Sequence, residues 1–298
     1  MSKVLITGAS GLIGSRLTEM LLQLGHEVAH LSRSKGLDNV PTFVWDVKKG
    51  TVENDAFQGV DAVVHLAGAG VADQRWTEKR KREILESRTS STALLVQHIA
   101  RNQQVKVVVS ASAIGYYGEG TGNKVFTEQD KPGHDYLAGV VDAWEKEVDK
   151  IPVKRIVKLR TGIVLSEKDG ALKKMVTPIR FFVGAPLGTG KQYISWIHID
   201  DLCRMFIKAI EDGSMYGVYN ATGPYAVTNT ELTKAIAKVL KRPLWLPNVP
   251  GFVLKLMLGE MGEMVLTGSQ VSSEKIQHKG FRFQFPELDK ALENLLNS

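Results

Sequence analysis

The sequence predicts an α/β protein with a doubly wound, mostly parallel sheet and a smaller, mainly helical C-terminal lobe. In the first half of the chain, short valine-rich apolar runs alternate with helical patterns, which is typical of a parallel sheet covered on both faces. A glycine-rich turn directly follows the first of these runs. After Leu165 the alternation ends, and the remaining sequence is mostly loop-like or helical.

The expected strands are buried apolar runs. The first five read KVLIT, EVAHLS, TFVWD, DAVVHLA and VKVVVSA; a sixth, RIVKLRTG, ends at Gly162, and a seventh, GVYNATG, comes late, at 217–223. Between and after these runs, apolar residues recur at three- and four-residue spacing. This period predicts helices over 11–24, 77–101 and 228–240, the last capped by Thr228 or Asn229.

On this pattern the chain divides into two parts. Residues 1–165 are predicted to form a nucleotide-binding domain of the Rossmann type, to which the strand at 217–223 returns. Residues 166–298 are predicted to form a smaller substrate lobe that ends in a helical tail.

Composition limits the class of protein. Of the 298 residues, 43% are hydrophobic and 23% are charged, which is typical of a soluble globular chain. The single cysteine, Cys203, excludes an internal disulfide framework and fits a reducing compartment. No signal peptide precedes the first strand, and no apolar run is long enough to span a membrane. We therefore expect a cytoplasmic protein without a membrane partner.

The charge pattern bears on possible partners. The formal net charge is +6, and a basic surface is one signature of nucleic-acid binding. However, the densest basic run, EKRKRE at 78–83, is bracketed by glutamates, which is typical of a solvated helix face. We expect no nucleic-acid partner. We also expect no metal, because no His, Cys or carboxylate cluster has the spacing of metal ligands.

The turn after the first strand has the spacing of a dinucleotide-binding loop. Gly8, Gly11 and Gly14 stand at G-x-x-G-x-x-G spacing between a strand and a helix. Gly8 permits a tight turn, Gly11 lets the backbone approach a pyrophosphate, and Gly14 allows close packing of helix on sheet. The free N–H groups of the helix N-terminus attract the phosphates. The residues expected to contact the cofactor here are Gly8, Ser10, Gly11, Leu12, Ile13 and Gly14.

The end of the second strand favours NADP over NAD. NAD-binding proteins usually place an Asp or Glu there to hold the ribose 2′-OH. This chain reads HLSRSKG, so that Ser32, Arg33 and Lys35 stand where the acid is expected. A carboxylate would repel a 2′-phosphate, whereas Arg33 can pair with it and Ser32 can donate a hydrogen bond to it. We therefore expect NADP(H) as the cofactor.

Two further strand ends are expected to line the same cleft. Asp46 and Val47 follow the third strand and are expected beside the adenine. Leu66, Ala67 and Gly68 follow the fourth and let the backbone approach the cofactor. Ordinary packing at a strand end is the alternative for each of these residues.

Taken together, these motifs resemble those of the extended short-chain dehydrogenase/reductase superfamily, which includes sugar-nucleotide epimerases and dehydratases. The chain is more narrowly similar to the atypical branch labelled epimerase family protein, which has a C-terminal domain of unassigned role. The motifs that carry the resemblance span essentially the whole chain and include ITGASGLIG, LSR, HLAGAG, SRTSST, SASAIGYYG, LRTGIVL, PLGTGKQYISWIHIDDL, NATGP and GFRFQFPELDKAL. The resemblance implies a seven-stranded, mostly parallel Rossmann sheet with a small substrate lobe.

The resemblance also implies cofactor contacts that spacing alone does not indicate. Glu83 and Arg88 match positions on the helix after the fourth strand, and an exposed charged helix face is the alternative for them. Gly162 and Ile163 match the turn after LRT, near the nicotinamide.

The active site implied by the resemblance is matched incompletely. In the superfamily a Ser or Thr after the fifth strand polarises a substrate oxygen, and a Tyr further along acts as acid and base. A Lys one helical turn after the Tyr lowers its pKa. Ser112 and Tyr136 match the first two positions, but Val140 stands at the third. An unassisted phenol has a pKa of about 10, so Tyr136 needs a substitute cation to act as a base.

Several alternatives stay open at this site. Tyr136 packed beside Trp144 is the structural alternative to catalysis, and the oxidised nicotinamide is one source of positive charge. The other candidate hydroxyl groups and cations are Ser110, Tyr116, Tyr117, His134 and Lys131.

We expect an NADP-dependent oxidoreductase or epimerase-type enzyme that moves hydride at a carbinol or carbonyl carbon of an unidentified small molecule, for example a nucleotide sugar. The alternative is an NADPH-binding sensor or scaffold with little turnover, which the missing lysine favours. Lys191 and Gln192 are expected at the edge of the substrate cleft, and Asp200 or Asp201 is expected to cap the next helix. A homodimer is left open.

Overall fold

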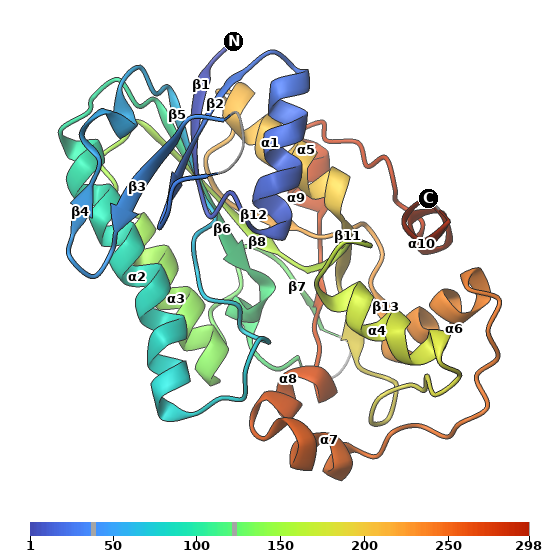
Figure 1. Ribbon diagram of the computed structural model, residues 1–298. Coiled ribbons are helices and arrows are strands. Elements are labelled where there is room, and N and C mark those ends of the chain that lie inside the picture. The colour runs from blue at the N-terminus through green and yellow to red at the C-terminus, as the bar shows by residue number, and fades with distance from the viewer. Residues whose placement is uncertain (37–39, 121–123, 298) are drawn as a thin grey trace.

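The protein is built on an eight-stranded sheet, shown in Figure 1 by a computed structural model that describes residues 1–36, 40–120 and 124–297. The strands follow the order β12-β8-β6-β5-β1-β2-β3-β4. The seven predicted strands are all present and pair in parallel, which confirms the predicted fold class. Their bounds are β1 (Lys3–Thr7), β2 (Glu27–Ser32), β3 (Thr42–Asp46), β5 (Ala62–His65), β6 (Val107–Ala113), β8 (Arg155–Thr161) and β12 (Gly217–Ala221). The eighth strand, β4 (Thr51–Val52), pairs antiparallel with β3 at the edge.

Helices cover both faces of the sheet, as a doubly wound arrangement requires (Figure 1). α1 (Leu12–Gln23) and α5 (Ile199–Glu211) pack on one face. α2 (Glu78–Ala100) and α3 (Tyr136–Val148) pack on the other. Over the described parts of the chain, none of the helices combines the length and apolar character needed to cross a bilayer.

The central strand β1 contributes to both hydrophobic cores. Val4 and Ile6 belong to the cluster with α1 and α5, and Leu5 belongs to the cluster with α2 and α3. All three side chains are 0% exposed. Because both faces are buried, the strand sequence is almost continuously apolar, which is the pattern that predicted the parallel sheet.

Shorter elements surround the carboxyl edge of the large sheet. The tail returns to the first half of the chain through β14, which pairs with β7, and it contacts the large sheet through α9, which packs beside β12. Thr228 caps α6 in a capping box with Glu231. The remaining bounds are β7 (Val125–Phe126), β9 (Ile163–Leu165), α4 (Ala171–Arg180), β10 (Tyr193–Ile194), β11 (Trp196–His198), β13 (Val227–Thr228), α6 (Asn229–Val239), α7 (Gly251–Leu258), α8 (Met261–Leu266), β14 (Gln270–Val271), α9 (Glu274–His278) and α10 (Leu288–Leu296), with short 3₁₀ turns at Asn54–Phe57 and Ile114–Tyr117.

The order of the strands reverses between β1 and β5. The chain runs outward from β1 to β4 on one side, then returns to β5 and continues to β12 on the other. In open α/β sheets, ligands bind outside the carboxyl ends of the strands at such a reversal. The topology therefore places the candidate site at the ends of β1 and β5.

The start of α5 is held differently from the expectation. The cap is His198, whose Nδ1 accepts the Asp200 N–H at 3.1 Å. Asp200 pairs instead with Arg16 of α1 at 2.7 Å. Asp201 is 0% exposed, and its carboxylate accepts the N–H groups of Gln284 and Phe285 at 2.8 Å each. Both aspartates are thus structural, but they join distant segments rather than cap their own helix.

Asp201→Ala should lower the free energy of unfolding by about 3–5 kcal/mol, because two amide groups lose a charged acceptor in a buried position. Asp200→Ala is the matched control, since its ion pair with Arg16 is partly exposed and should contribute only about 1 kcal/mol. Urea unfolding of both variants measures the difference. Equal decreases in the free energy of unfolding would show that the contacts of Asp201 to the tail stabilise the protein no more than the Asp200–Arg16 ion pair does.

Candidate cofactor and active site

The β1–α1 loop has the backbone that a dinucleotide requires. Gly8 has a φ of +69°, and a Cβ there would lie 2.9 Å from the Leu66 carbonyl carbon. A Cβ on Gly14 would lie 2.5 Å from the Gly8 oxygen. A Cβ on Gly11 would meet only the Gly8 oxygen, at 3.3 Å, and Gly11 is exposed. Gly8 and Gly14 are therefore needed for packing, whereas Gly11 leaves an open approach to the helix N-terminus.

The rest of the loop presents backbone rather than side chains. Ser10 is exposed, and Leu12 and Ile13 are half-buried in the first turn of α1. No described side chain caps this helix. The N–H groups of its first turn consequently face the open side of the loop, which is the arrangement that binds phosphate.

Arg33 is the available cation at the end of β2. Ser32 is half-buried, and Arg33 is exposed. Within the described residues, the Arg33 guanidinium has no hydrogen-bond or ion-pair partner. Lys35, by contrast, is paired with Glu53 at 2.8 Å. The side chains present therefore fit a 2′-phosphate, with Arg33 as a charged donor that none of the described residues engages.

Asp46 already has a structural role at the end of β3. Its Oδ1 accepts the N–H groups of Lys48 and Lys49 at 2.9 and 3.1 Å, and these bonds lower the pKa of its carboxyl group. Its Oδ2 lies 3.8 Å from the Lys49 ammonium. Val47 beside it is half-buried. Because the turn uses Oδ1, a contact to an adenine would be made by Oδ2 of Asp46.

Buried hydroxyl groups fix the backbone at the carboxyl end of β5. The Thr7 hydroxyl oxygen accepts the Leu66 N–H at 3.1 Å and the Ala67 N–H at 3.2 Å. It lies 2.8 Å from Nδ1 of His65, whose Nε2 lies 2.9 Å from the Thr92 hydroxyl. Thr7, His65 and Thr92 are each 0% exposed. Leu66 and Ala67 are therefore held by the strand that begins the cofactor loop.

These contacts determine the direction of each hydrogen bond. Because the Thr7 oxygen already accepts two N–H groups, its own proton goes to Nδ1 of His65. His65 therefore carries its proton on Nε2 and donates it to Thr92, whose hydroxyl donates to the Arg88 carbonyl at 2.7 Å. Only a neutral imidazole satisfies both partners, and burial lowers the pKa of His65 to about 3.

Arg88 holds the loop after β5. Its Nη1 donates to the carbonyls of Ala69 and Ile84 at 3.0 and 2.9 Å, and burial lowers its pKa to about 10. A Cβ on the exposed Gly68 would lie 3.2 Å from its guanidinium carbon. Arg88 therefore supports the loop backbone through Nη1, and its contact to the cofactor stays a prediction.

Glu83 contacts the loop after β5 through another side chain, Arg80. It pairs with Arg80 at 2.8 Å, and Arg80 donates to the Gly70 carbonyl at 2.5 Å. The exposed carboxylate of Glu83 thus supports a residue that supports the loop. Its contact to the cofactor likewise stays a prediction.

Gly162 and Ile163 lie at the carboxyl end of β8, as predicted. A Cβ on Gly162 would lie 2.3 Å from the Ser195 oxygen. The Ile163 N–H donates to that same oxygen at 2.9 Å, which begins the pairing of β9 with β11. Close packing of these two strands therefore requires a glycine at 162.

The structure does not bring together the two hydroxyl groups expected at the active site. Ser112 is 4% exposed, and its hydroxyl donates to Glu145 Oε1 at 2.6 Å. The Tyr136 hydroxyl donates to the Lys81 carbonyl at 2.7 Å. Tyr136 begins α3 and Glu145 lies near its end, so on the order of 13 Å of helix axis separates them. In this conformation both hydroxyl groups are engaged by protein partners, Ser112 near one end of α3 and Tyr136 at the other.

A buried ion pair holds Ser112. Arg160 of β8 donates from Nε and Nη2 to the two carboxylate oxygens of Glu145, at 2.8 and 2.9 Å. Arg160 is 3% exposed and Glu145 is 5% exposed. This bidentate pair is satisfied without a ligand, so Ser112 completes a structural network.

The other candidate phenols differ in their surroundings. Tyr117 is buried; its hydroxyl donates to Asn220 at 2.6 Å, and burial raises its pKa to about 12. Tyr116 is half-buried, with the Arg160 guanidinium carbon 3.3 Å from its ring centroid. Among the described residues, none hydrogen-bonds to the Tyr116 hydroxyl, which makes it the freer phenol. Ser110 is 0% exposed and donates to the Ala111 carbonyl.

Val140 and the two remaining candidate cations differ in burial. Val140 is 4% exposed, so the face of α3 where the lysine was expected is apolar core. His134 and Lys131 are exposed. No group of three His, Cys, Asp or Glu side chains among the described residues could hold a metal ion.

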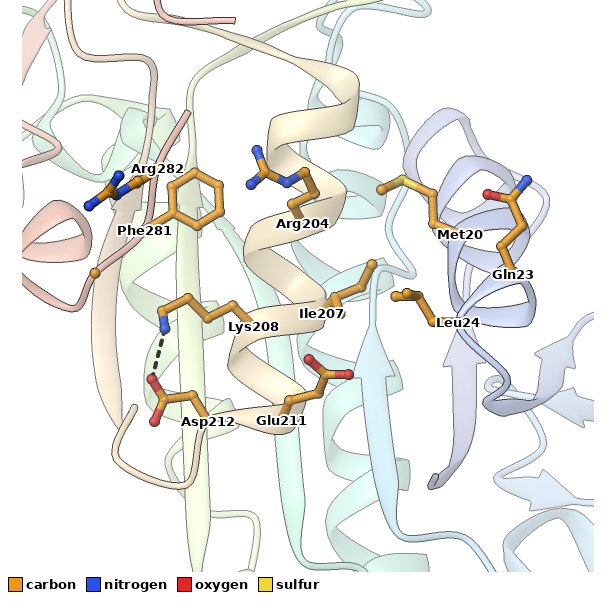
Figure 2. Close-up of a pocket in the computed structure, with 11 residues that line it drawn as sticks. Met20, Gln23, Leu24, Arg204, Ile207, Lys208, Glu211, Asp212, Phe281 and Arg282 are labelled. Atoms are coloured by element: carbon orange, nitrogen blue, oxygen red, sulfur yellow. Dashed lines mark hydrogen bonds and ion pairs between the residues drawn. The ribbon is translucent and has the colours of Figure 1, made fainter. Parts of the chain in front are cut away.

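A groove of about 780 Å³ lies away from this site, between α1, α5 and residues 280–282 (Figure 2). Leu24 and Glu211, at the far ends of the two helices, line it, so it is at the edge of the sheet opposite the glycine loop. Its charges are partly paired, since Lys208 contacts Asp212 at 3.0 Å. The groove is therefore not the cofactor site.

Comparisons with known proteins agree with the fold and the motifs. Residues 4–139 match the NAD dependent epimerase/dehydratase family, and residues 249–295 match a domain of unknown function (DUF1731). The epimerase family protein YfhF of Bacillus subtilis is 36% identical over 98% of this chain and 97% of its own length. The chain belongs to the epimerase family. The resemblance predicted from its sequence is thereby confirmed.

Related sequences and structures extend this result. The SDR39U1 homolog of Arabidopsis thaliana, described as chloroplastic, is 37% identical over 98% of this chain and 86% of its own length. The crystal structure of human epimerase family protein SDR39U1 (isoform2) with NADPH superposes with a TM-score of 0.90 at 31% identity, covering 99% of both chains. UDP-glucose 4-epimerase from Thermus thermophilus, solved with NAD, has a TM-score of 0.77 at 21% identity over 99% of this chain and 98% of its own, and shows the fold alone.

The neutral state of His65 should be visible in the pH dependence of stability. Between pH 6.5 and about 3, an unfolded chain binds a proton at His65 and the folded chain does not. Stability is therefore lost as the pH falls through this window, by up to about 1.4 kcal/mol per pH unit. His65→Asn keeps an acceptor facing Thr7 and should remove that share of the slope. Urea unfolding at several pH values measures both slopes, and equal slopes would mean that His65 is charged in the folded protein.

Proposed function

We propose that the protein binds NADP(H) and exchanges hydride with a carbonyl or carbinol carbon of a small molecule. The observation that carries the proposal is the open backbone at Gly11, with an unpartnered Arg33 at the end of the neighbouring strand, within the part of the chain that the structure describes. Human SDR39U1, the relative solved with NADPH, supports the choice of cofactor. The substrate is proposed to be a soluble small molecule, with a nucleotide sugar as one candidate class.

The residues that would hold the cofactor are distributed over five strand ends, those of β1, β2, β3, β5 and β8. The first turn of α1 would hold the pyrophosphate, and Ser32 with Arg33 would hold the 2′-phosphate. The ends of β3 and β5 would line the adenosine, and the turn at Gly162 would face the nicotinamide. When bound, the nicotinamide supplies the carbon that gives or takes hydride.

The protein itself must then supply the proton. Burial raises the pKa of Tyr136, and the charges of Arg88 and Lys81 oppose this only in part. To act as acid or base, Tyr136 must leave the Lys81 carbonyl, which accepts its proton in a hydrogen bond but cannot take it up. Tyr116 is the alternative phenol, because its hydroxyl has no such partner among the described residues.

A second candidate function is an NADPH-binding sensor or scaffold with little turnover. The specific observation that favours it is the commitment of both expected catalytic hydroxyl groups, Ser112 to Glu145 and Tyr136 to Lys81. Such a protein would hold the cofactor without a working proton donor beside it. The two candidates share the cofactor site and differ only in turnover.

NADPH should bind more tightly than NADH. Arg33→Ala should reduce the difference between their binding free energies by about 1.5–3 kcal/mol, which is the contribution of a hydrogen bond to a charged group. NADH is an internal control, because it lacks the 2′-phosphate. Lys35→Ala is the matched control variant, since the Lys35 ammonium is already paired with Glu53. Calorimetric titration gives all the affinities. Equal affinities for the two cofactors in the wild type would end the NADP assignment.

Tyr136→Phe removes only the hydroxyl and keeps the ring packed against Trp76, with the two ring centroids 5.2 Å apart. If Tyr136 is the acid and base, turnover of screened carbonyl substrates with NADPH should fall about 100-fold or more, while NADPH affinity stays unchanged. Tyr116→Phe tests the alternative phenol in the same assay. Loss of turnover in Tyr116→Phe alone would transfer the role, and a wild type that binds NADPH without turnover would favour the sensor.

A further inference from the structure

The segment that matches the domain of unknown function begins with a helical hairpin, α7 and α8, which we call the α7–α8 hairpin (residues 249–267). Figure 1 shows it beyond the carboxyl edge of the sheet, next to the loop that joins β5 to α2. Its two helices pack against each other. The hairpin therefore stands on the side of the molecule where the cofactor loop opens.

The two ends of the hairpin are rooted in the C-terminal part. At its start, the Val249 N–H donates to the Pro186 carbonyl at 2.8 Å, and the Val249 carbonyl accepts the Gly188 N–H at 2.9 Å. At its end, Gln192 donates to the Val265 carbonyl at 3.1 Å. Hydrogen bonds to the backbone thus fix both roots.

The tip of the hairpin, residues 256–260, is held by two side chains that follow β5, one in the β5–α2 loop and one in α2. Arg75 donates from Nε to the Met257 carbonyl at 2.9 Å and from Nη2 to the Leu256 carbonyl, and these carbonyls end α7. Lys81 of α2 forms an ion pair with Glu260 between the two helices. These contacts cross from one half of the protein to the other.

The packing of the hairpin is weak by comparison with its roots. Leu254 is the buried side chain of α7, and Met261 that of α8. Phe252 is 73% exposed and Leu256 is 77% exposed, although both are apolar. In the Lys81–Glu260 ion pair Glu260 is 63% exposed and Lys81 18%, and such a partly exposed pair contributes only about 1 kcal/mol to stability. A segment with few buried contacts and solvent-exposed polar links opens at low free energy.

Lys81 joins the tip to the candidate active site. Its carbonyl accepts the Tyr136 hydroxyl, its ammonium lies 5.5 Å from the Tyr136 ring centroid, and that same ammonium pairs with Glu260. The release of Glu260 therefore changes the charge beside Tyr136 as well as the position of the hairpin.

We propose that the α7–α8 hairpin is a lid over the cofactor and substrate side, rooted at both ends and latched at its tip by Arg75 and by the Lys81–Glu260 ion pair. The latch closes the loop between β5 and α2 against the C-terminal part, and its opening admits and releases ligands. This role rests on the proposed binding of NADP(H) at the carboxyl edge.

Two isosteric substitutions on the partners of Lys81 test the lid. Glu260→Gln removes the carboxylate that crosses to the hairpin. Glu78→Gln is the matched control, because Glu78 contacts the same ammonium, at 3.4 Å, from within α2. Hydrogen exchange of residues 250–267 reports the lid, and stopped-flow fluorescence reports the rate of NADPH dissociation. In Glu260→Gln we expect the exchange and the dissociation rate each to rise about threefold to tenfold, as for loss of a weak contact. Glu78→Gln should match the wild type.

The outcomes separate the lid from the proposed function. Wild-type exchange in Glu260→Gln would overturn the latch, and faster exchange with unchanged NADPH dissociation would overturn the gate. Equal effects of both substitutions would assign them to the charge of Lys81 and also overturn the latch. A wild type that does not bind NADPH would remove the proposed function, and the exchange result would still decide whether the tip is latched.

Discussion

The Thr7 hydroxyl at the carboxyl end of β1 is the contact on which the candidate cofactor site depends. It accepts the amide groups of Leu66 and Ala67 and donates to His65, so it joins the two central strands where their order reverses. The join brings the Leu66 carbonyl so close to Gly8 that a side chain does not fit there. The turn that would face a dinucleotide is therefore shaped from behind, by a buried network whose members are all paired.

Helix α2 carries this network outward to the surface of the site. Thr92 accepts a hydrogen bond from His65 Nε2, Arg88 donates to the Ala69 carbonyl, and the Lys81 carbonyl accepts a hydrogen bond from the Tyr136 hydroxyl. Arg88 and Glu83, which the family resemblance assigned to the cofactor, thus also support the loop that would line it. A change on α2 therefore also acts on the backbone of residues 69 and 70.

The sheet could be predicted from sequence because strands buried on both faces are continuously apolar, and the glycine loop because Gly8 and Gly14 have steric reasons to be glycines. The orientation of Ser112 was not predicted. On β6, Val108 faces α2 and α3, and strand alternation places Ser112 on the same side, toward Glu145. The pairing of Glu145 with Arg160 joins a helix to the neighbouring strand β8, and neither residue type signals burial in the sequence. The hydrogen bond of His65 in β5 was not predicted, because its partner Thr92 lies 27 residues away, on a helix.

Because position 140 is a valine, the positive charges near Tyr136 come from α2 and not from α3. Val140 belongs to the core, so no cation can approach Tyr136 along α3 without burying a charge. Three cations that act on the Tyr136 hydroxyl come from α2, and each is already engaged: Arg88 with carbonyl groups, Lys81 with Glu260, and Arg80 with Glu83. A phenol bonded to a carbonyl can give up its proton only after that bond is broken. Proton transfer at Tyr136 would therefore require its hydroxyl to separate from the first turn of α2, where Lys81 also contacts the tip of the hairpin. Chemistry and ligand access then depend on the same residue, Lys81, through its carbonyl in one case and its ammonium in the other.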